Sequence, residues 1–120
     1  MIPQSCFPSF RDRAMRLVLA VSALMLLATT PPAAAEDVTI IQRNKAFSVA
    51  EVSAKVGDRL RFVNADTVAH NLYSVTPGFE FEILAQAPGR SDAVGIRAPG
   101  ALIVECAIHP GMKLRVNVAR

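Results

Sequence analysis

The chain contains very little cysteine. Only Cys6 and Cys106 occur among its 120 residues, and Cys6 lies in an N-terminal segment that we expect to be removed. The disulfide framework that stabilises many small exported domains is therefore excluded within the remaining chain. A lone thiol in an oxidising compartment is prone to oxidation unless something protects it, and metal ligation is one such protection.

Long apolar runs are also missing. The uncharged run at 17–28 is shorter than the roughly 20 residues that a membrane-spanning helix needs. It follows arginines at positions 11, 13 and 16, and it is followed by the small residues Ala33-Ala34-Ala35. This order predicts a secretory signal peptide, residues 1–35, cleaved after Ala35. We expect a periplasmic protein whose mature domain is 36–120, with Met1 or Met15 as the first residue translated.

This mature domain has no excess of either charge. Ten Lys and Arg residues stand against nine Asp and Glu residues in 36–120. The domain lacks the basic stripe that nucleic-acid binding requires, so we expect no nucleic-acid partner. A nearly neutral protein relies on apolar fit more than on charge steering to recognise other proteins.

Helical periodicity is absent, whereas period-2 alternation is clear. Leu60 and Phe62 alternate with arginines, and Leu114, Val116 and Val118 alternate with polar residues, which predicts strands with one face on a core. Further strands are predicted at 38–42, 46–52, 70–75, 93–97 and 102–106. Segment 79–87 fits either an irregular strand or a turn of helix. Short strands separated by Gly, Pro and Asn turns predict an all-β antiparallel sandwich or barrel.

Three of the four soft metal donors of residues 36–120 are close together in the sequence. Cys106, His109 and Met112 follow one another at three-residue spacing around the turn-forming Pro110-Gly111. His70 is the other histidine, and it is expected at the start of another strand. Two imidazoles, one thiolate and a weak thioether are the donors of a blue-copper centre. The pattern predicts that all four residues belong to one metal site.

These residues resemble the ligand motifs of the cupredoxins, in particular the plastocyanin and amicyanin group. The loop Cys106–Met112 has the amicyanin-like spacing, Val56–Asn64 resembles a conserved strand of the family, and His70-Asn71 resembles its first-ligand pair. The resemblance implies a Greek-key β-sandwich that binds one copper ion through His70, Cys106, His109 and Met112. It also implies that the Asn71 side chain ties the two ligand loops together.

The resemblance further implies an electron-transfer protein, not an enzyme. Electrons would pass through the exposed edge of His109, inside an apolar patch to which Pro110, Gly111, Pro77 and Phe79 contribute. The expected partners are redox proteins that bind transiently, and the expected state is a monomer. The strand before the cysteine departs from the family because 102–105 contains no aromatic residue.

Several alternatives remain at this point. A copper chaperone or storage module would bind the metal without redox cycling, although such proteins usually carry more Met or Cys donors. Structural zinc has no use for a thioether, and an iron–sulfur cluster needs more cysteines. A thiol nucleophile with a histidine base lacks an evident oxyanion hole. In a metal-free interaction domain, a lone cysteine on a strand would be a small core residue.

Overall fold

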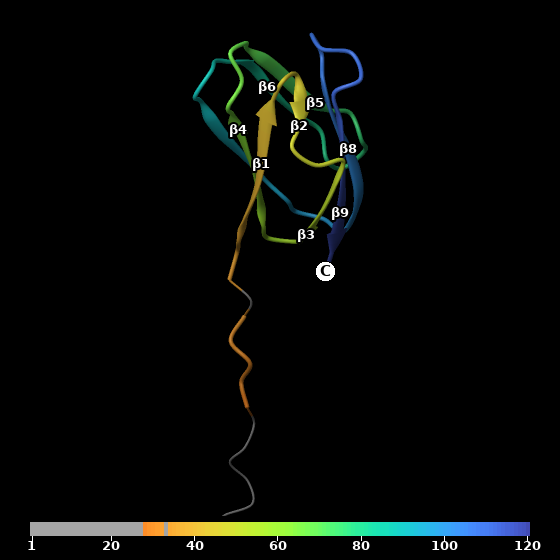
Figure 1. Cartoon of the computed structure of the whole chain (residues 1–120). Coiled ribbons are helices and arrows are strands. Elements are labelled where there is room, and N and C mark those ends of the chain that lie inside the picture. Colours follow the sequence, from red (N-terminus) through yellow and green to blue (C-terminus); the bar gives the residue numbers. More distant parts are fainter. Residues whose placement is uncertain (1–27, 33) are drawn as a thin grey trace, which may run out of the picture. The chain divides into compact units, whose positions relative to one another are not determined.

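The computed structural model describes residues 28–32 and 34–120, and residues 34–120 form one compact unit. The predicted signal peptide lies mostly outside the described residues and stays a prediction. Nine strands follow one another in the described chain (Figure 1). They are β1 (Asp37–Arg43), β2 (Ala46–Phe47), β3 (Glu51–Lys55), β4 (Arg59–Asn64), β5 (His70–Ser74), β6 (Phe81–Gln86), β7 (Ser91–Gly95), β8 (Gly100–Cys106) and β9 (Lys113–Ala119). No helix in this part of the chain is long and apolar enough to span a membrane.

The strands form two sheets. One has the order β2-β1-β4-β7 and the other the order β3-β9-β8-β5-β6. The predicted all-β class is confirmed, and the topology is consistent with a Greek key. Two strand pairs, β1–β4 and β3–β9, differ from the antiparallel expectation because they are parallel. Period-2 alternation shows which face of a strand is buried, and it contains no information on the direction of the neighbouring strand.

Three predicted strands have different bounds in the structure. The predicted strand 46–52 is divided between β2 and β3, which lie in different sheets. The Ser48 amide donates to Ile41 O over 2.8 Å just before the chain changes sheet. The predicted strand 93–97 is observed as β7, two residues earlier. The ambiguous segment 79–87 contains strand β6 and no helical turn.

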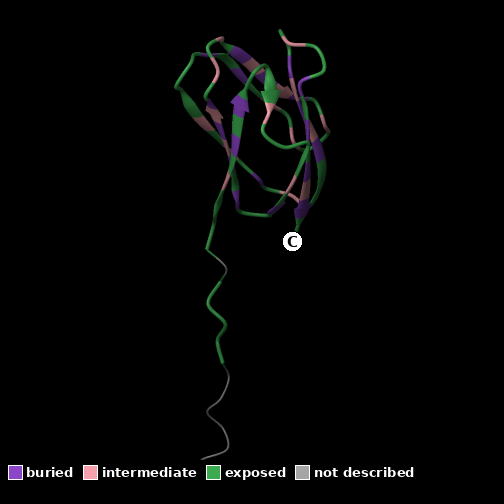
Figure 2. Cartoon of the chain, viewed as in Figure 1, coloured by how far each residue is buried: buried purple, intermediate pink, exposed green. Residues whose placement is uncertain are grey.

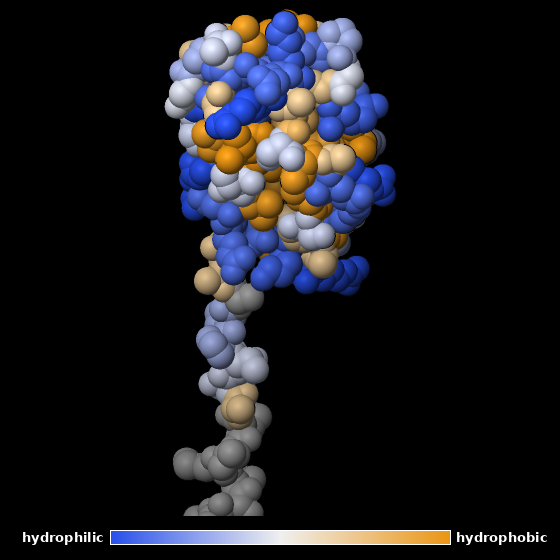
Figure 3. Space-filling view, in the orientation of Figure 1, coloured by the Kyte–Doolittle hydropathy of each residue, from blue (hydrophilic) through white to orange (hydrophobic). Residues whose placement is uncertain are grey.

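The core lies between the two sheets. Inward and outward residues alternate along most strands, as the purple and green bands in Figure 2 show. Leu60 and Phe62 of β4 and Leu114 and Val116 of β9 are all 0% exposed, as their alternation predicts. Burying one such side chain stabilises the fold by about 1.5–3 kcal/mol. Outside the core, apolar and polar side chains mix on the face shown in Figure 3, with apolar ones gathered near its middle.

Polar side chains are buried where β4 and β6 end, next to the start of β5. Gln42, Asn64 and Gln86 are each 0% exposed. Asn64 Nδ2 donates to Val68 O at 2.9 Å and to Gln86 O at 2.8 Å. Gln86 Nε2 donates to Phe62 O at 3.0 Å, and Gln42 Nε2 donates to Gln86 Oε1 at 2.5 Å. Because Asn64 binds Val68 inside loop 65–69 and also Gln86 at the end of β6, it holds the loop that leads into His70 against β6.

Candidate metal centre

Sheet pairing brings the predicted ligands to one end of the sandwich. His70 is the first residue of β5, and Cys106 is the last residue of β8. These strands are antiparallel neighbours in which Leu72 faces Cys106. His70 is 0% and Cys106 6% exposed, whereas His109, in the following loop, is half-buried. The end of one strand and the beginning of its neighbour therefore place both side chains at the same edge.

Three donor atoms converge on a common point. His70 Nδ1 lies 3.1 Å from His109 Nδ1, and Cys106 Sγ lies 3.8 Å and 3.5 Å from these two nitrogens. A point in the plane of the three atoms is about 2.0 Å from each, close to the roughly 2.0–2.3 Å of metal–nitrogen and metal–sulfur bonds in protein sites. The three residues are also of types that bind metals, and their ligand atoms all lie within 4.8 Å of one another. The donor set and its spacing therefore fit a metal ion.

The loop from Cys106 to Met112 is closed by its own main chain. The Cys106 amide donates to Met112 O, and the Met112 amide donates to His109 O, each over 3.2 Å. Gly111 has a φ of +87°, a value that favours glycine at this turn. Met112 itself is 3% exposed. The loop thus turns back on itself and buries its methionine, while its histidine stays half-exposed.

The structure adds Asp66 to the site, a residue that the sequence analysis missed. Its Oδ2 lies 3.2 Å from His70 Nε2 and accepts the Lys45 amide at 2.7 Å. Asn64 Oδ1 accepts the Asp66 amide and so holds the carboxylate in place. A carboxylate facing Nε2 favours the proton on that nitrogen, which leaves the lone pair of Nδ1 directed at the common point. Its position four residues before His70 in the sequence was the available signal.

Burial and hydrogen bonding set the charges of this pair. Burial lowers the pKa of His70, and this effect exceeds the opposing effect of the Asp66 hydrogen bond. The Lys45 amide is the main reason that the pKa of Asp66 lies below its ordinary value. At neutral pH the site therefore combines a neutral imidazole with an ionised carboxylate. A neutral imidazole is the form that binds metal.

Asn71 of β5 is linked to β6 and to the ligand loop, by contacts that differ from the expectation. Its main-chain carbonyl accepts the Ala107 amide at 2.8 Å, which ties β5 to the ligand loop. Its side-chain Oδ1 accepts the Ala85 amide of β6 at 2.7 Å. Ala85 has a φ of +49°, an uncommon value for alanine that accompanies the irregular pairing of β5 and β6. The side chain therefore braces β6, and the main chain makes the contact with the ligand loop.

The surface around His109 differs from the predicted patch. The exposed apolar residue beside it in the loop is Ile108, which is 49% exposed. Leu84 is 58% exposed on β6, next to the Asn71-bound Ala85. Pro110 and Gly111 are exposed in the loop, as expected. The predicted contribution of Pro77 and Phe79 to this patch was wrong. Both residues follow β5, which begins at His70 and leads away from the metal site. Phe79 lies at the far end of β8, because a Cβ added to Gly100 would be 3.5 Å from its ring.

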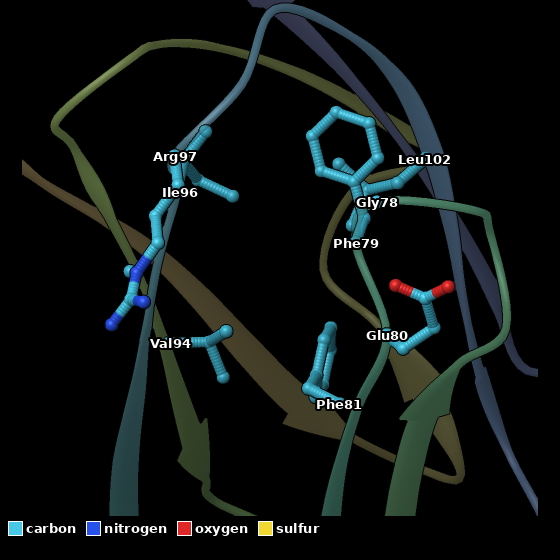
Figure 4. A pocket seen from close by; sticks show the side chains of 9 residues that line it. Gly78, Phe79, Glu80, Phe81, Val94, Ile96, Arg97 and Leu102 are labelled. Carbon is cyan, nitrogen blue, oxygen red and sulfur yellow. The ribbon is translucent and has the colours of Figure 1, made fainter.

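A cavity of about 290 Å³ confirms where Phe79 lies. Figure 4 shows Phe79, Phe81, Val94, Ile96 and Leu102 around it, with Glu80 and Arg97 also on its lining. These residues come from the start of β6 and the turn before it, from the end of β7 and the residues after it, and from the first half of β8. None of the four predicted ligands lines this cavity. It is separate from the site formed by His70, Cys106 and His109.

Known proteins resemble this chain in sequence and in fold. No protein-family model matches it. It is 33% identical over 107 residues to the methylamine utilization protein MauL of Methylorubrum extorquens, a match that covers 88% of this chain and 94% of MauL. Among solved structures, a reduced mutant of amicyanin has a TM-score of 0.64 at 19% identity, covering 77% of this chain and 88% of amicyanin. A purple cupredoxin from Nitrosopumilus maritimus has a TM-score of 0.60 at 22% identity, covering 68% of this chain and 98% of that one.

A larger copper protein contains the same fold. The copper-containing nitrite reductase NirK from Thermus scotoductus has a TM-score of 0.64 at 22% identity, and the match covers 76% of this chain but 23% of NirK. The fold is thus shared by small cupredoxins and by one part of a larger protein. Sequence relationship to MauL, the two-sheet fold and the His-Cys-His group agree with the resemblance seen in the sequence. The chain belongs to the cupredoxin family of copper proteins.

Proposed function

We propose that residues 36–120 form a mononuclear blue-copper protein that carries single electrons between redox partners, with His70, Cys106, His109 and Met112 as the copper ligands. The observation that carries this proposal is the convergence of two imidazole nitrogens and one thiol within 3.8 Å of one another. These donors with a thioether are the ligand set of blue-copper sites. Bound copper supplies a Cu(II)/Cu(I) couple that no amino acid side chain here provides.

The protein's own contribution is to hold the donors still. His70 is fixed by Asp66 on its outer nitrogen, and Cys106 and His109 belong to a loop closed by main-chain hydrogen bonds. Asn71 joins this loop to β5 and supports β6, which is its proposed role outside the ligand set. Donors that are fixed before the metal binds have little freedom to move when its charge changes. A rigid ligand set favours electron transfer over release of the metal.

Exposure suggests where electrons enter and leave. Of the three converging residues, His109 is the one that is half-exposed, whereas His70 and Cys106 are buried. Its exposed neighbours in the loop include the apolar residues Ile108 and Pro110. Weak redox encounters use small interfaces, often below about 1,200 Å². A redox protein that binds this surface transiently is the proposed partner, and the proposed state is a monomer that is not itself an enzyme.

The proposed location is the periplasm, after removal of residues 1–35. The sequence order of basic, apolar and small residues supports export. The relative MauL is named for methylamine utilization. An amine-oxidising dehydrogenase is therefore the redox partner to test first.

Voltammetry with a chelator competition tests the proposal against a copper chaperone. The copper-loaded chain 36–120 is expected to give a reversible one-electron wave and to lose copper slowly to a chelator in both oxidation states. A chaperone would release Cu(I) rapidly and would show no reversible wave. Rapid release without a wave would contradict electron transfer while leaving copper binding intact.

A further inference from the structure

Asp58 is a buried carboxylate with which no described cation forms an ion pair, and the charge of Lys55 is the smallest of the influences that act on its pKa. It lies in the turn between β3 and β4 and is 3% exposed. Its Oδ1 accepts the Glu36 amide at 3.1 Å, and its Oδ2 accepts the Lys55 amide at 2.8 Å. Among the residues that the structure describes, Asp58 takes part in none of the ion pairs. Buried charges in proteins are normally paired, so this carboxylate lacks its usual counter-ion.

Hydrogen bonds of both main-chain groups of Glu36 hold its nitrogen against this carboxylate. Glu36 precedes β1 directly, and its carbonyl accepts the Arg59 amide at 2.8 Å while its own amide donates to Asp58. The next residues toward the N-terminus, Ala34 and Ala35, are exposed. The Ala35–Glu36 peptide bond therefore joins an exposed segment to a nitrogen that is fixed in the fold.

This bond is also the cleavage site that the sequence predicts. Hydrolysis would add the hydroxyl of water to the Ala35 carbonyl carbon and a proton to the Glu36 nitrogen. The resulting amine takes a further proton from water at neutral pH and becomes an ammonium ion, since α-amino groups have a pKa of about 7.7–8.0. Cleavage thus creates a positive charge on an atom that already contacts Asp58 Oδ1.

We propose that the Ala35–Glu36 bond is the processing site of the precursor and that the new α-ammonium group of Glu36 pairs with Asp58, supplying the missing counter-ion. The processing site rests on the proposed export of the protein, whereas the ion pair can be tested without it. The ion pair requires processing at this one bond, because an amine one residue earlier or later would not occupy the position of the Glu36 nitrogen. Cleavage then strengthens the end of the sandwich opposite the metal centre.

Neighbouring charges do not substitute for this ammonium group. The Lys55 amine is farther than 4.0 Å from Asp58, because no ion pair joins them. Arg59 and Arg61 both bind Asp37, at 2.7 Å and 2.8 Å. The Glu36 side chain is exposed and adds a negative charge nearby. A hollow of about 260 Å³ lined by Glu36, Lys55 and Asp58 leaves room for the larger ammonium group.

A comparison of N-termini tests the ion pair. Residues 34–120 contain all nine strands and the whole described core, so the chain 36–120 is expected to fold alone. It would be released from a cleavable fusion with a free amine on Glu36, and compared with the N-acetylated chain and with 35–120. The acetylated chain keeps an N–H for Asp58 but no charge. NMR titration of ¹⁵N-labelled Glu36 would measure the pKa of its amine.

The expected result is a raised pKa and a pH-dependent stability difference. We expect the pKa of the Glu36 amine to lie about one unit above its ordinary value, because an opposite charge favours the protonated form. A raised folded-state pKa means added stability below the unfolded-state pKa, lost as pH rises through the folded-state pKa. The Tm of the free-amine chain should exceed that of the acetylated chain at pH 6–7, and the two should agree near pH 10.

Asp58→Asn provides the matched control. Asparagine keeps an oxygen that can accept an amide but carries no charge, so the pKa of the Glu36 amine should return to about 7.7–8.0. An ordinary pKa in the unmodified chain, with equal Tm for free and acetylated chains, would overturn the ion pair. Intact mass of protein exported from the full 120-residue chain tests the processing site separately, and any mature N-terminus other than Glu36 would overturn that half.

Discussion

The two ends of the sandwich are built from the same strands but differ in what they bury. Three polar residues are 0% exposed at the metal end, namely Asn64, His70 and Gln86. The Asn64 side chain donates to the main chain of Gln86, and the His70 side chain contacts Asp66 in loop 65–69. At the other end the first half of β8 buries Leu102 in an apolar core beside a cavity, and Asp58 is a buried polar residue in the turn between β3 and β4. The strands thus separate the two ends, and the geometry of the metal site depends on buried polar contacts that hold its loops in place.

The largest stability loss is expected at the apolar end. Leu102 is 1% exposed and lies on the same strand as Cys106. Leu102→Ala should lower the free energy of unfolding by about 2–5 kcal/mol, because it leaves a cavity. Urea denaturation would measure this loss, and the visible spectrum of the copper form should stay unchanged. An altered spectrum would show that the two ends are not independent.

Asn64→Ala should affect both stability and metal binding. It removes donors from Val68 O and Gln86 O and the acceptor of the Asp66 amide. The Gln86 carbonyl is the buried one of these groups, and leaving it without a partner costs about 1–3 kcal/mol. Loop 65–69 should loosen, so copper affinity, measured by chelator competition, should fall as well.

Asn117→Ala is the control for this substitution. Asn117 lies on β9, and its side chain donates to the exposed Glu51. A surface change of this kind alters stability by about 0.5 kcal/mol or less. If Asn64→Ala lowered stability without reducing copper affinity, the buried polar contacts would serve the fold alone.

Asp66→Asn tests what the negative charge of Asp66 contributes at the metal end. Asparagine can still accept the Lys45 amide, but it provides no carboxylate for His70 Nε2. Loss of such a partner typically reduces metal affinity by about 10–100-fold. Asp37→Asn, at the other end, removes a carboxylate that binds Arg59 and Arg61 and should leave copper affinity unchanged. Equal affinities for both variants would contradict the role given to Asp66.

The fold class and the grouping of His70, Cys106 and His109 were predictable because both depend on local patterns. Alternation in β4 and β9 identified the buried faces, and the scarcity of His, Cys and Met left few candidates for a soft metal site. Asp66 was not predictable, because its contact with His70 depends on how Asn64 folds loop 65–69. Phe79 was misplaced because sequence spacing does not show that β5 carries the chain to the opposite end.

The smallest effect at neutral pH is expected for Asp58, at the end opposite the metal centre. Its contribution to stability changes mainly at acid pH. The Lys55 amide, followed by the Glu36 amide, lowers the pKa of Asp58. A lowered folded-state pKa contributes stability above the unfolded-state pKa of about 3.9, and this contribution is lost as pH falls through the folded-state pKa. Urea midpoints of the metal-free chain should therefore decline below about pH 4. Asp58→Asn should flatten the decline, and an unchanged pH profile would contradict this assignment.

The spectrum of the copper-loaded protein tests the central claim most directly. Adding Cu(II) to the purified chain 36–120 should produce an intense blue charge-transfer band from the Cys106 thiolate to copper, with one ion bound per chain. Cys106→Ser should abolish the band even where copper still binds through His70 and His109. A colourless copper complex of the unmodified chain, or an unchanged band in Cys106→Ser, would contradict a blue-copper centre formed by these residues.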